Sequence, residues 1–129
     1  MKRDMELVRK ILFKIEETVD NFAEYNIEIE GYTKEQVAYH CALLNDSNFV
    51  YDYGSQPVGG EIYSFGVGRL TWEGHEFLDK IRSDTVWNRT KEVITEKGLP
   101  MAIDVVKSIS TTLISAMVEG AIKGLKQQN

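Results

Sequence analysis

The chain has 129 residues, of which 43 % are hydrophobic and 27 % are charged, a composition typical of one globular core of modest size. Its formal net charge is −5, and residues 1–82 carry 9 Lys and Arg against 15 Asp and Glu, which counts against a protein with a broad basic surface for duplex DNA. The single cysteine, Cys41, excludes an intrachain disulfide and leaves no zinc-finger spacing.

The N-terminal segment is charged, and no uninterrupted apolar run approaches the ~18 residues that a membrane span needs. We therefore expect a cytoplasmic protein with no transmembrane segment. From Leu7 to Phe22, apolar residues recur at the spacing of an amphipathic helix. Residues 26–31 alternate isoleucine with glutamate before a glycine, which predicts a short edge strand.

Thr33 and Gln36 form a capping-box pattern at the start of a helix that we predict to end near Ser47. Asn48 suits the left-handed exit from that helix. Its buried stripe is predicted to contain Val37, Cys41 and Leu44.

Two aromatic strands are predicted next, over residues 49–53 and 61–70, joined through a tip rich in glycine and proline. Thr71 then caps a further helix. The buried stripe of that helix is predicted to contain Trp72, Phe77, Leu78 and Ile81.

Beyond residue 82, Ser83 caps a helix that Gly98 and Pro100 stop, and a final helix runs from about residue 101 to 125. We thus expect an α+β fold with a domain over residues 1–82 and a two-helix C-terminal extension over 83–129. The element order in the domain is that of the back half of a winged helix. Only about ten residues separate the first helix from Thr33, so the usual second helix is predicted to be reduced to a turn.

Three segments carry a family resemblance: residues 30–44 (EGYTKEQVAYHCALL), residues 69–79 (RLTWEGHEFLD) and residues 85–88 (TVWN). Together with the opening MKRDM, they resemble the uncharacterised bacterial and prophage family called domain of unknown function 2513. This resemblance implies a winged-helix-like fold and a bacterial or phage setting. It implies no activity and no catalytic residues.

The exposed face of the helix over residues 34–47 is predicted to bind protein. It lacks arginine and carries carboxylates, which repel a phosphate backbone, whereas aromatic residues are favoured at the centre of protein interfaces. The residues of this face are Tyr39, Ala42, Leu43 and Asp46.

The last helix has one apolar face with small residues four positions apart, which favours close packing against another helix. We expect self-association as a homodimer through this face. Packing on the first helix and membrane-surface binding through Lys107, Lys123 and Lys126 are the alternatives. The predicted self-association residues are Val106, Ile109, Leu113, Ala116, Met117, Gly120 and Gly124.

The sequence therefore predicts a small non-catalytic bacterial or phage binding protein. The alternative function is a DNA-binding regulator that places two wings on a duplex as a dimer. Its nucleic-acid contacts would come from Lys2, Arg3, Lys34, Tyr53 and Arg69.

We predict no catalytic site, metal, cofactor or small-molecule substrate. Adjacent helical positions direct His40 and Cys41 apart, so both are interpreted as packed residues rather than as a nucleophile pair or metal ligands. Glu73, His75, Glu76 and Asp79 are interpreted as exposed surface charge rather than as acid/base groups.

Overall fold

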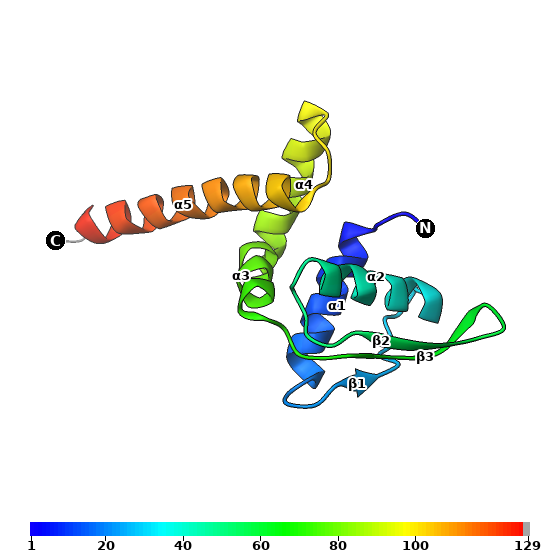
Figure 1. The fold of residues 1–129 in the computed structure, drawn as a ribbon. Helices are drawn as coiled ribbons and strands as arrows, with labels where there is room; N and C mark the ends of the chain where they lie inside the picture. The colour runs from blue at the N-terminus through cyan, green and yellow to red at the C-terminus, as the bar shows by residue number, and fades with distance from the viewer. Residues whose placement is uncertain (128–129) are drawn as a thin grey trace. The chain divides into compact units, whose positions relative to one another are not determined.

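The computed structural model describes residues 1–127 and confirms the mixed α+β class (Figure 1). The chain divides into two compact units, Met1–Leu78 and Asp79–Asn129, which we describe separately. The elements are α1 (Met5–Thr18), β1 (Glu24–Tyr25), α2 (Lys34–Asp46), β2 (Gly54–Val58), β3 (Glu61–Val67), α3 (Trp72–Ile81), α4 (Asp84–Lys97) and α5 (Ile103–Gln127).

The first helix, α1, begins after Asp4, whose carboxylate accepts hydrogen bonds from the amides of Glu6 and Leu7 at 2.9 and 3.3 Å. This cap pairs two of the amides that a helix leaves unsatisfied at its N-terminus. The apolar stripe from Leu7 to Ile15 is buried, as predicted. The extension of the stripe to Phe22 is wrong, because α1 ends at Thr18 and Phe22 is exposed in the following loop.

The sheet is antiparallel and has the strand order β1-β3-β2. The predicted hairpin exists, but its first strand is Gly54–Val58 rather than residues 49–53. Gly59 and Gly60, both with positive φ, form a shorter tip than predicted. The edge strand predicted at residues 26–31 is also displaced, since β1 lies at Glu24–Tyr25 and pairs with the C-terminal end of β3.

The second helix, α2, has the predicted capping box, in which Thr33 Oγ1 accepts from the Gln36 amide and Gln36 Oε1 accepts from the Thr33 amide. Asn48 has the predicted positive φ, at 61°. Two charged side chains from the first turn of α2 reach β3. Lys34 Nζ donates to the Tyr63 carbonyl at 3.2 Å, and Glu35 Oε1 accepts from the Ile62 amide at 2.8 Å. Helix α2 is thereby fastened to the hairpin.

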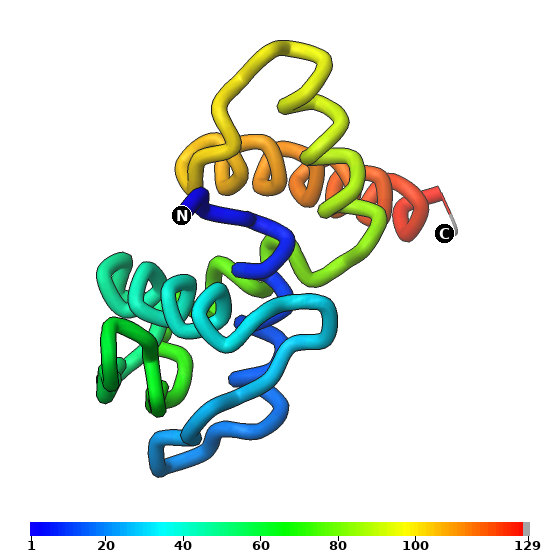
Figure 2. The backbone as a smooth tube through the Cα atoms, turned by 90° about the vertical axis from the view of Figure 1, so that its right-hand side faces the viewer, coloured from blue at the N-terminus to red at the C-terminus, as the bar shows by residue number. Residues whose placement is uncertain are grey.

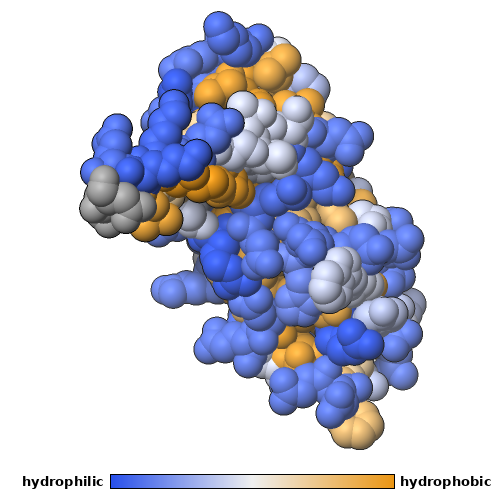
Figure 3. All heavy atoms as spheres, turned by 90° about the vertical axis from the view of Figure 1, so that its left-hand side faces the viewer, coloured by the Kyte–Doolittle hydropathy of each residue, from blue (hydrophilic) through white to orange (hydrophobic). Residues whose placement is uncertain are grey.

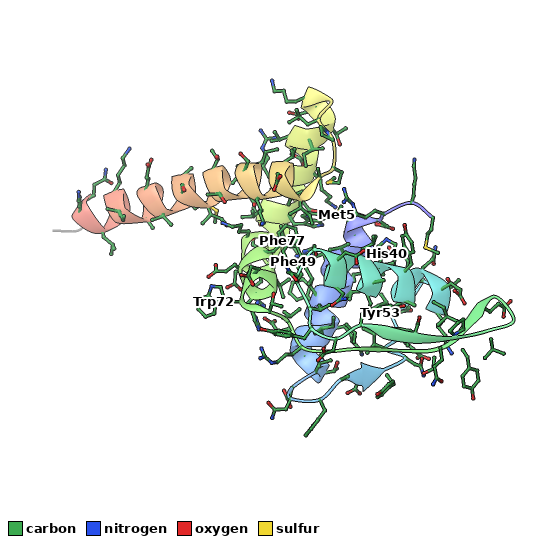
Figure 4. The ribbon with its side chains drawn as sticks, viewed as in Figure 1. Met5, His40, Phe49, Tyr53, Trp72 and Phe77 are labelled. Carbon is green, nitrogen blue, oxygen red and sulfur yellow. The ribbon has the colours of Figure 1, made fainter. Side chains whose placement is uncertain are left out.

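The third helix, α3, begins at Thr71, whose hydroxyl accepts from the Gly74 amide at 3.0 Å and donates to the Asn48 carbonyl at 2.5 Å. Phe77 is buried and stacks on Phe49 with ring centroids 5.0 Å apart, and Figure 4 shows the two rings side by side. Trp72, predicted to be buried, is 75 % exposed because it occupies the first helical position on the solvent side.

In the second unit, α4 and α5 pack against each other as a helical hairpin, and Figure 2 shows the loop that joins them. Ser83 caps α4 as predicted, and Gly98 ends it in the left-handed conformation. The buried residues at the packing surface include Trp87 and Ile94 of α4 and Val106 of α5. A long α5 thus packs along only part of its length.

Thr90 lies fully buried in α4, and within residues 1–127 its hydroxyl oxygen has no hydrogen-bond partner. A buried hydroxyl without a partner costs about 1–3 kcal/mol relative to water. We therefore expect Thr90→Val, which keeps the shape and removes the hydroxyl, to raise the free energy of unfolding by about 1 kcal/mol in chemical denaturation. Thr85→Val at an exposed position of the same helix is the control and should change stability by less than about 0.5 kcal/mol. A loss of stability in Thr90→Val would contradict this prediction.

Candidate interaction surfaces

The α2 face predicted to bind protein is at the surface of the first unit. Tyr39 is 38 % exposed, Ala42 and Leu43 are half-buried, and Asp46 is exposed. The Tyr39 ring meets the buried His40 ring edge to face, with centroids 5.7 Å apart. The face therefore presents the Tyr39 ring, which packs on His40, beside the apolar side chains of Ala42 and Leu43.

The predicted self-association residues of α5 fall into two groups. Val106 is fully buried within its own unit and is not available to a second chain, so its assignment to that surface is corrected. Ile109 and Leu113 are half-buried, whereas Ala116, Met117 and Gly120 are exposed and Gly124 is intermediate. A Cβ atom at Gly120 or Gly124 would meet nothing within 4 Å, so the small-residue seam is unpacked within the chain.

Sequence periodicity alone did not identify the other apolar residues of this half of α5. Val118, Ile122 and Leu125 are 51, 46 and 64 % exposed. Figure 3 shows hydrophobic side chains at the surface along the C-terminal half of α5. A shallow groove of the same unit is lined by Ile114, Met117, Val118 and Ala121 on α5 and by Asp79, Lys80, Ser83 and Val86.

Helix α5 is also, among the described residues, the one helix long and apolar enough to cross a bilayer by length and composition. Its 18-residue window has a mean hydropathy of 1.3, and 11 % of that window is buried. The sequence did not reveal this segment as one apolar run because Lys107, Glu119 and Lys123 interrupt it.

The residues assigned to the alternative nucleic-acid site are dispersed over the first unit. Lys34 donates to the Tyr63 carbonyl, Tyr53 packs near Phe65 with ring centroids 6.5 Å apart, and Arg69 stacks on Tyr51 at 4.5 Å. Burial raises the pKa of the Tyr53 hydroxyl. Lys2 and Arg3 lie in the exposed segment before α1. Lys34 and Arg69 lie near opposite ends of the β3 ladder.

The two histidines have different surroundings. His40 is buried, its Nε2 accepts from the Asp4 amide at 2.8 Å, and its Nδ1 donates to the Gln36 carbonyl at 2.7 Å. His75 is exposed and lies 3.8 Å from Glu16. Within residues 1–127, no three His, Cys, Asp or Glu side chains come close enough to hold a metal ion. Through its bonds to Asp4 and Gln36, His40 links the start of α1 to α2.

Cys41 is fully buried, and burial raises the pKa of its thiol from 9.0 to about 12. Only the thiolate is nucleophilic, so we expect Cys41 in the native protein to be unreactive toward Ellman's reagent at pH 8. In denaturant the thiol should react stoichiometrically and fast. A native-state reaction as fast as that of an exposed thiol would contradict the buried position.

The raised pKa of Cys41 also has a consequence for stability. Between pH 9.0 and about 12 the unfolded chain loses the thiol proton while the native chain keeps it. The contribution of Cys41 to stability is therefore complete below pH 9 and is lost as the pH rises through this range.

One surface was missed entirely from sequence. A hollow in the first unit is lined by residues from three separate segments, among them Tyr25, Asp52, Gly54 and Gly66. The sequence places Asp52 inside a strand and Gly54 in a loop tip, so nothing indicates that these residues meet. The cross-strand register, which pairs Gly54 with Gly66, brings them together.

Comparison with known proteins places the chain in a family without assigning an activity. The family profile described as "Hypothetical protein (DUF2513)" matches residues 2–100. An uncharacterized protein of Haemophilus influenzae is 39 % identical over 123 residues, which cover 92 % of this chain and 99 % of that protein. No solved structure matches significantly. The chain therefore belongs to the DUF2513 family, as the motifs at residues 30–44 and 69–79 predicted.

Proposed function

We propose that this protein is a small, non-catalytic bacterial or phage binding module. It would act through protein–protein contacts outside the membrane and self-associate through α5. The observation that carries the proposal is the exposed apolar half of α5, where Met117, Val118 and Leu125 are each more than half exposed. Apolar surface of this extent on one helix is usually covered by a partner.

Apolar residues in this half of α5 form a continuous stripe, in which Val118, Ala121 and Leu125 are exposed and Ile114 is half-buried. At 100° per residue, Ile114, Val118, Ala121 and Leu125 lie within about 60° of one another. Their spacing of four, three and four residues is that of the seam of a helical pair, in which side chains of one helix fit between those of the other. A second copy of α5 is therefore the proposed partner.

Self-association accounts for α5 better than membrane insertion does. Glu119 and Lys123 lie within the helix that would cross the bilayer, and a charge at the centre of such a helix costs about 2.5–3.5 kcal/mol. In a helical pair both side chains remain in water, because they lie on the side of α5 opposite the stripe. The hydroxyl groups of Ser108, Thr111 and Thr112 add polar surface at the N-terminal half.

We further propose that the first unit is a reduced winged helix. The order α1-β1-α2-β2-β3, with β1 beside β3 in the sheet, supports this assignment. The turn at Ile29–Tyr32, closed by the bond from the Tyr32 amide to the Ile29 carbonyl at 3.2 Å, stands where a second helix would be. In this scheme, α2 would be the helix that reads DNA in a duplex-binding relative.

The exposed face of α2 instead favours a protein partner. Tyr39 supplies an aromatic centre, while the first-turn cation Lys34 already bonds to β3. Base reading and phosphate contact depend on Arg, Lys, Asn and Gln. We therefore propose the face formed by Tyr39, Ala42, Leu43 and Asp46 as a second protein-binding surface, and we rank DNA binding below it.

Sedimentation equilibrium tests the self-association. We expect the wild-type mass to exceed the 14.7 kDa of one chain at micromolar concentration, and both Val118→Glu and Leu125→Glu to return it to one chain. Thr112→Glu introduces the same charge on the opposite face of α5 and should leave the mass unchanged. A wild-type mass of one chain at every concentration would remove the proposal.

Two further assays separate the competing functions. Co-flotation of the wild-type protein with phospholipid vesicles would favour membrane insertion of α5 over self-association. Binding to random duplex DNA that weakens steeply with added salt would favour the alternative function, a DNA-binding regulator, because phosphate neutralisation releases counterions. The proposed function expects neither result.

A further inference from the structure

We propose that the hollow on the outer face of the sheet binds an arginine side chain of a partner polypeptide. The hollow lies wholly within the first unit, and the inference does not rest on self-association through α5. Its lining residues are Ala23, Tyr25, Asp52, Tyr53, Gly54, Ser55, Gln56, Ser64, Phe65 and Gly66.

The floor of the hollow is made by two glycines. Gly54 on β2 and Gly66 on β3 are direct cross-strand partners, so both would direct a side chain to the same face of the sheet. A Cβ atom on Gly54 would meet nothing within 4 Å. At Gly54, bare backbone therefore forms an open part of the floor on which a planar group can lie in contact.

The ring of Tyr25 bounds the hollow on one side. Tyr25 pairs with Gly66, and a Cβ atom on Gly66 would come within 2.9 Å of Tyr25 Cε1. The ring therefore covers the Gly66 half of the floor and leaves the Gly54 half open. Tyr25 is 70 % exposed, so its ring is accessible to a group that enters over Gly54.

The polar groups around the floor favour a cation with several donors. Asp52 is the one charged residue of the lining, and no lysine or arginine contributes to it. Gln56 and Ser64 are cross-strand partners on the same face, two residues along from the glycine pair, and add an amide and a hydroxyl oxygen. Such a set disfavours a phosphate and attracts positive charge.

Asp52 also has an uncommon backbone conformation. Its φ of 53° lies in the left-handed region, which costs a non-glycine residue on the order of 1 kcal/mol. Strain of this kind occurs at sites that need a side chain in a fixed place. Asp52 lines the hollow two residues before Gly54 in the chain.

Arginine fits these features better than lysine does. A guanidinium is planar, stacks on aromatic rings and donates in a fork that matches a carboxylate. Lysine carries the same charge on a compact ammonium group, which is not planar and cannot stack on the backbone of the glycines. The strand β2 beside the hollow is exposed along its whole length, so a polypeptide can reach it.

The test is a titration of the full-length protein followed by backbone amide NMR. The probes are three blocked tripeptides, Gly-X-Gly, in which X is arginine, lysine or citrulline. Citrulline keeps the planar shape of arginine and lacks the charge. We expect the arginine peptide to shift the amides of Gly54, Gly66 and Asp52 in a saturable manner at millimolar concentration. The lysine and citrulline peptides should bind at least about tenfold more weakly.

Two variants locate the site, and each should preserve the fold. Asp52→Asn retains a residue that tolerates positive φ and removes the charge, and it should weaken arginine binding about tenfold or more. Gly54→Ala places a methyl group in open space on the floor and should also weaken binding. Val58→Ala, at the far end of β2, is the control and should bind as the wild type does.

Three results would overturn the proposal. These are the absence of saturable shifts with the arginine peptide, equal binding of the citrulline peptide, and unchanged binding in both Asp52→Asn and Gly54→Ala. None of these results bears on the mass measured for α5 variants, so the two proposals fail independently.

Discussion

Gly74→Ala should lower the free energy of unfolding of the first unit by about 3 kcal/mol, at the upper end of the effects of overpacking. Gly74 lies in the first turn of α3 against the segment that contains Phe49. A Cβ atom there would overlap the Phe49 carbonyl oxygen and lie 3.1 Å from its carbonyl carbon. Because the obstacle is backbone, which is held by the bond from the Thr71 amide to the Phe49 carbonyl, it cannot rotate away.

The control for this prediction is the same substitution elsewhere. Gly120 lies in the exposed half of α5, where a Cβ atom would meet nothing within 4 Å. Gly120→Ala should raise helix stability by up to about 1 kcal/mol, the intrinsic difference between the two residues. Urea denaturation of both variants at a concentration below self-association measures the opposite signs. A neutral Gly74→Ala would show that α3 does not approach Phe49 so closely.

His40→Leu should destabilise the first unit by a comparable amount, about 3 kcal/mol. The imidazole accepts from the Asp4 amide, and Leu cannot do so. Asp4 also caps α1 and accepts from the Tyr32 hydroxyl at 3.3 Å, so the lost bond loosens a connected set of contacts. Burial is the main cause of the raised pKa of the Tyr32 hydroxyl, and the negative charge of Asp4 raises it further.

Thermal unfolding followed by circular dichroism measures this effect. His75→Leu is the matched control. His75 is exposed, and its Nδ1 approaches Glu16 Oε2 no closer than 3.8 Å, so its substitution should change stability by less than about 0.5 kcal/mol. Equal stability of the two variants would show that the bond between His40 and Asp4 contributes little. The experiment distinguishes a buried structural histidine from a surface one.

The capping residues of the helices were the most predictable features of the fold. Thr33, Thr71 and Ser83 all cap helices as expected, and Gly98 ends α4 with a φ of 62°. These signals are local, since a cap depends on three or four consecutive residues. The buried residues Val37, Cys41 and Leu44 were predictable for the same reason, because one helical stripe defines them.

The strands were harder to place. The aromatic residues at 49–53 have the higher intrinsic preference for a strand, yet β2 forms at Gly54–Val58, which contains glycine and proline. Pairing outward from the tip at Gly59 and Gly60 fixes the hairpin, and a register shift at Gln56/Pro57 accommodates the proline. Tertiary pairing here outweighs residue preference.

The candidate surfaces were predictable only in part. The α2 face was located from the helical stripe, and its residues are accessible. Of the residues predicted for self-association on α5, Val106 is buried in its own unit, because periodicity shows that a face is apolar but not which segment a neighbouring helix covers. The hollow over Gly54 and Gly66 depends on cross-strand register, which a single sequence does not specify.

The residues that flank β3 on its two sides disfavour pairing of this sheet with strands of another chain. Strand β1 covers only two residues of β3, and beyond it Asn26 exchanges bonds with Phe65, its Oδ1 accepting from the Phe65 amide at 3.0 Å and its own amide donating to the Phe65 carbonyl at 2.8 Å. On the other border, Pro57 removes one donor from β2 and the register shift bends the strand. Edge-to-edge pairing between strands of different chains, the contact from which fibrils grow, is thus disfavoured on both sides of the sheet.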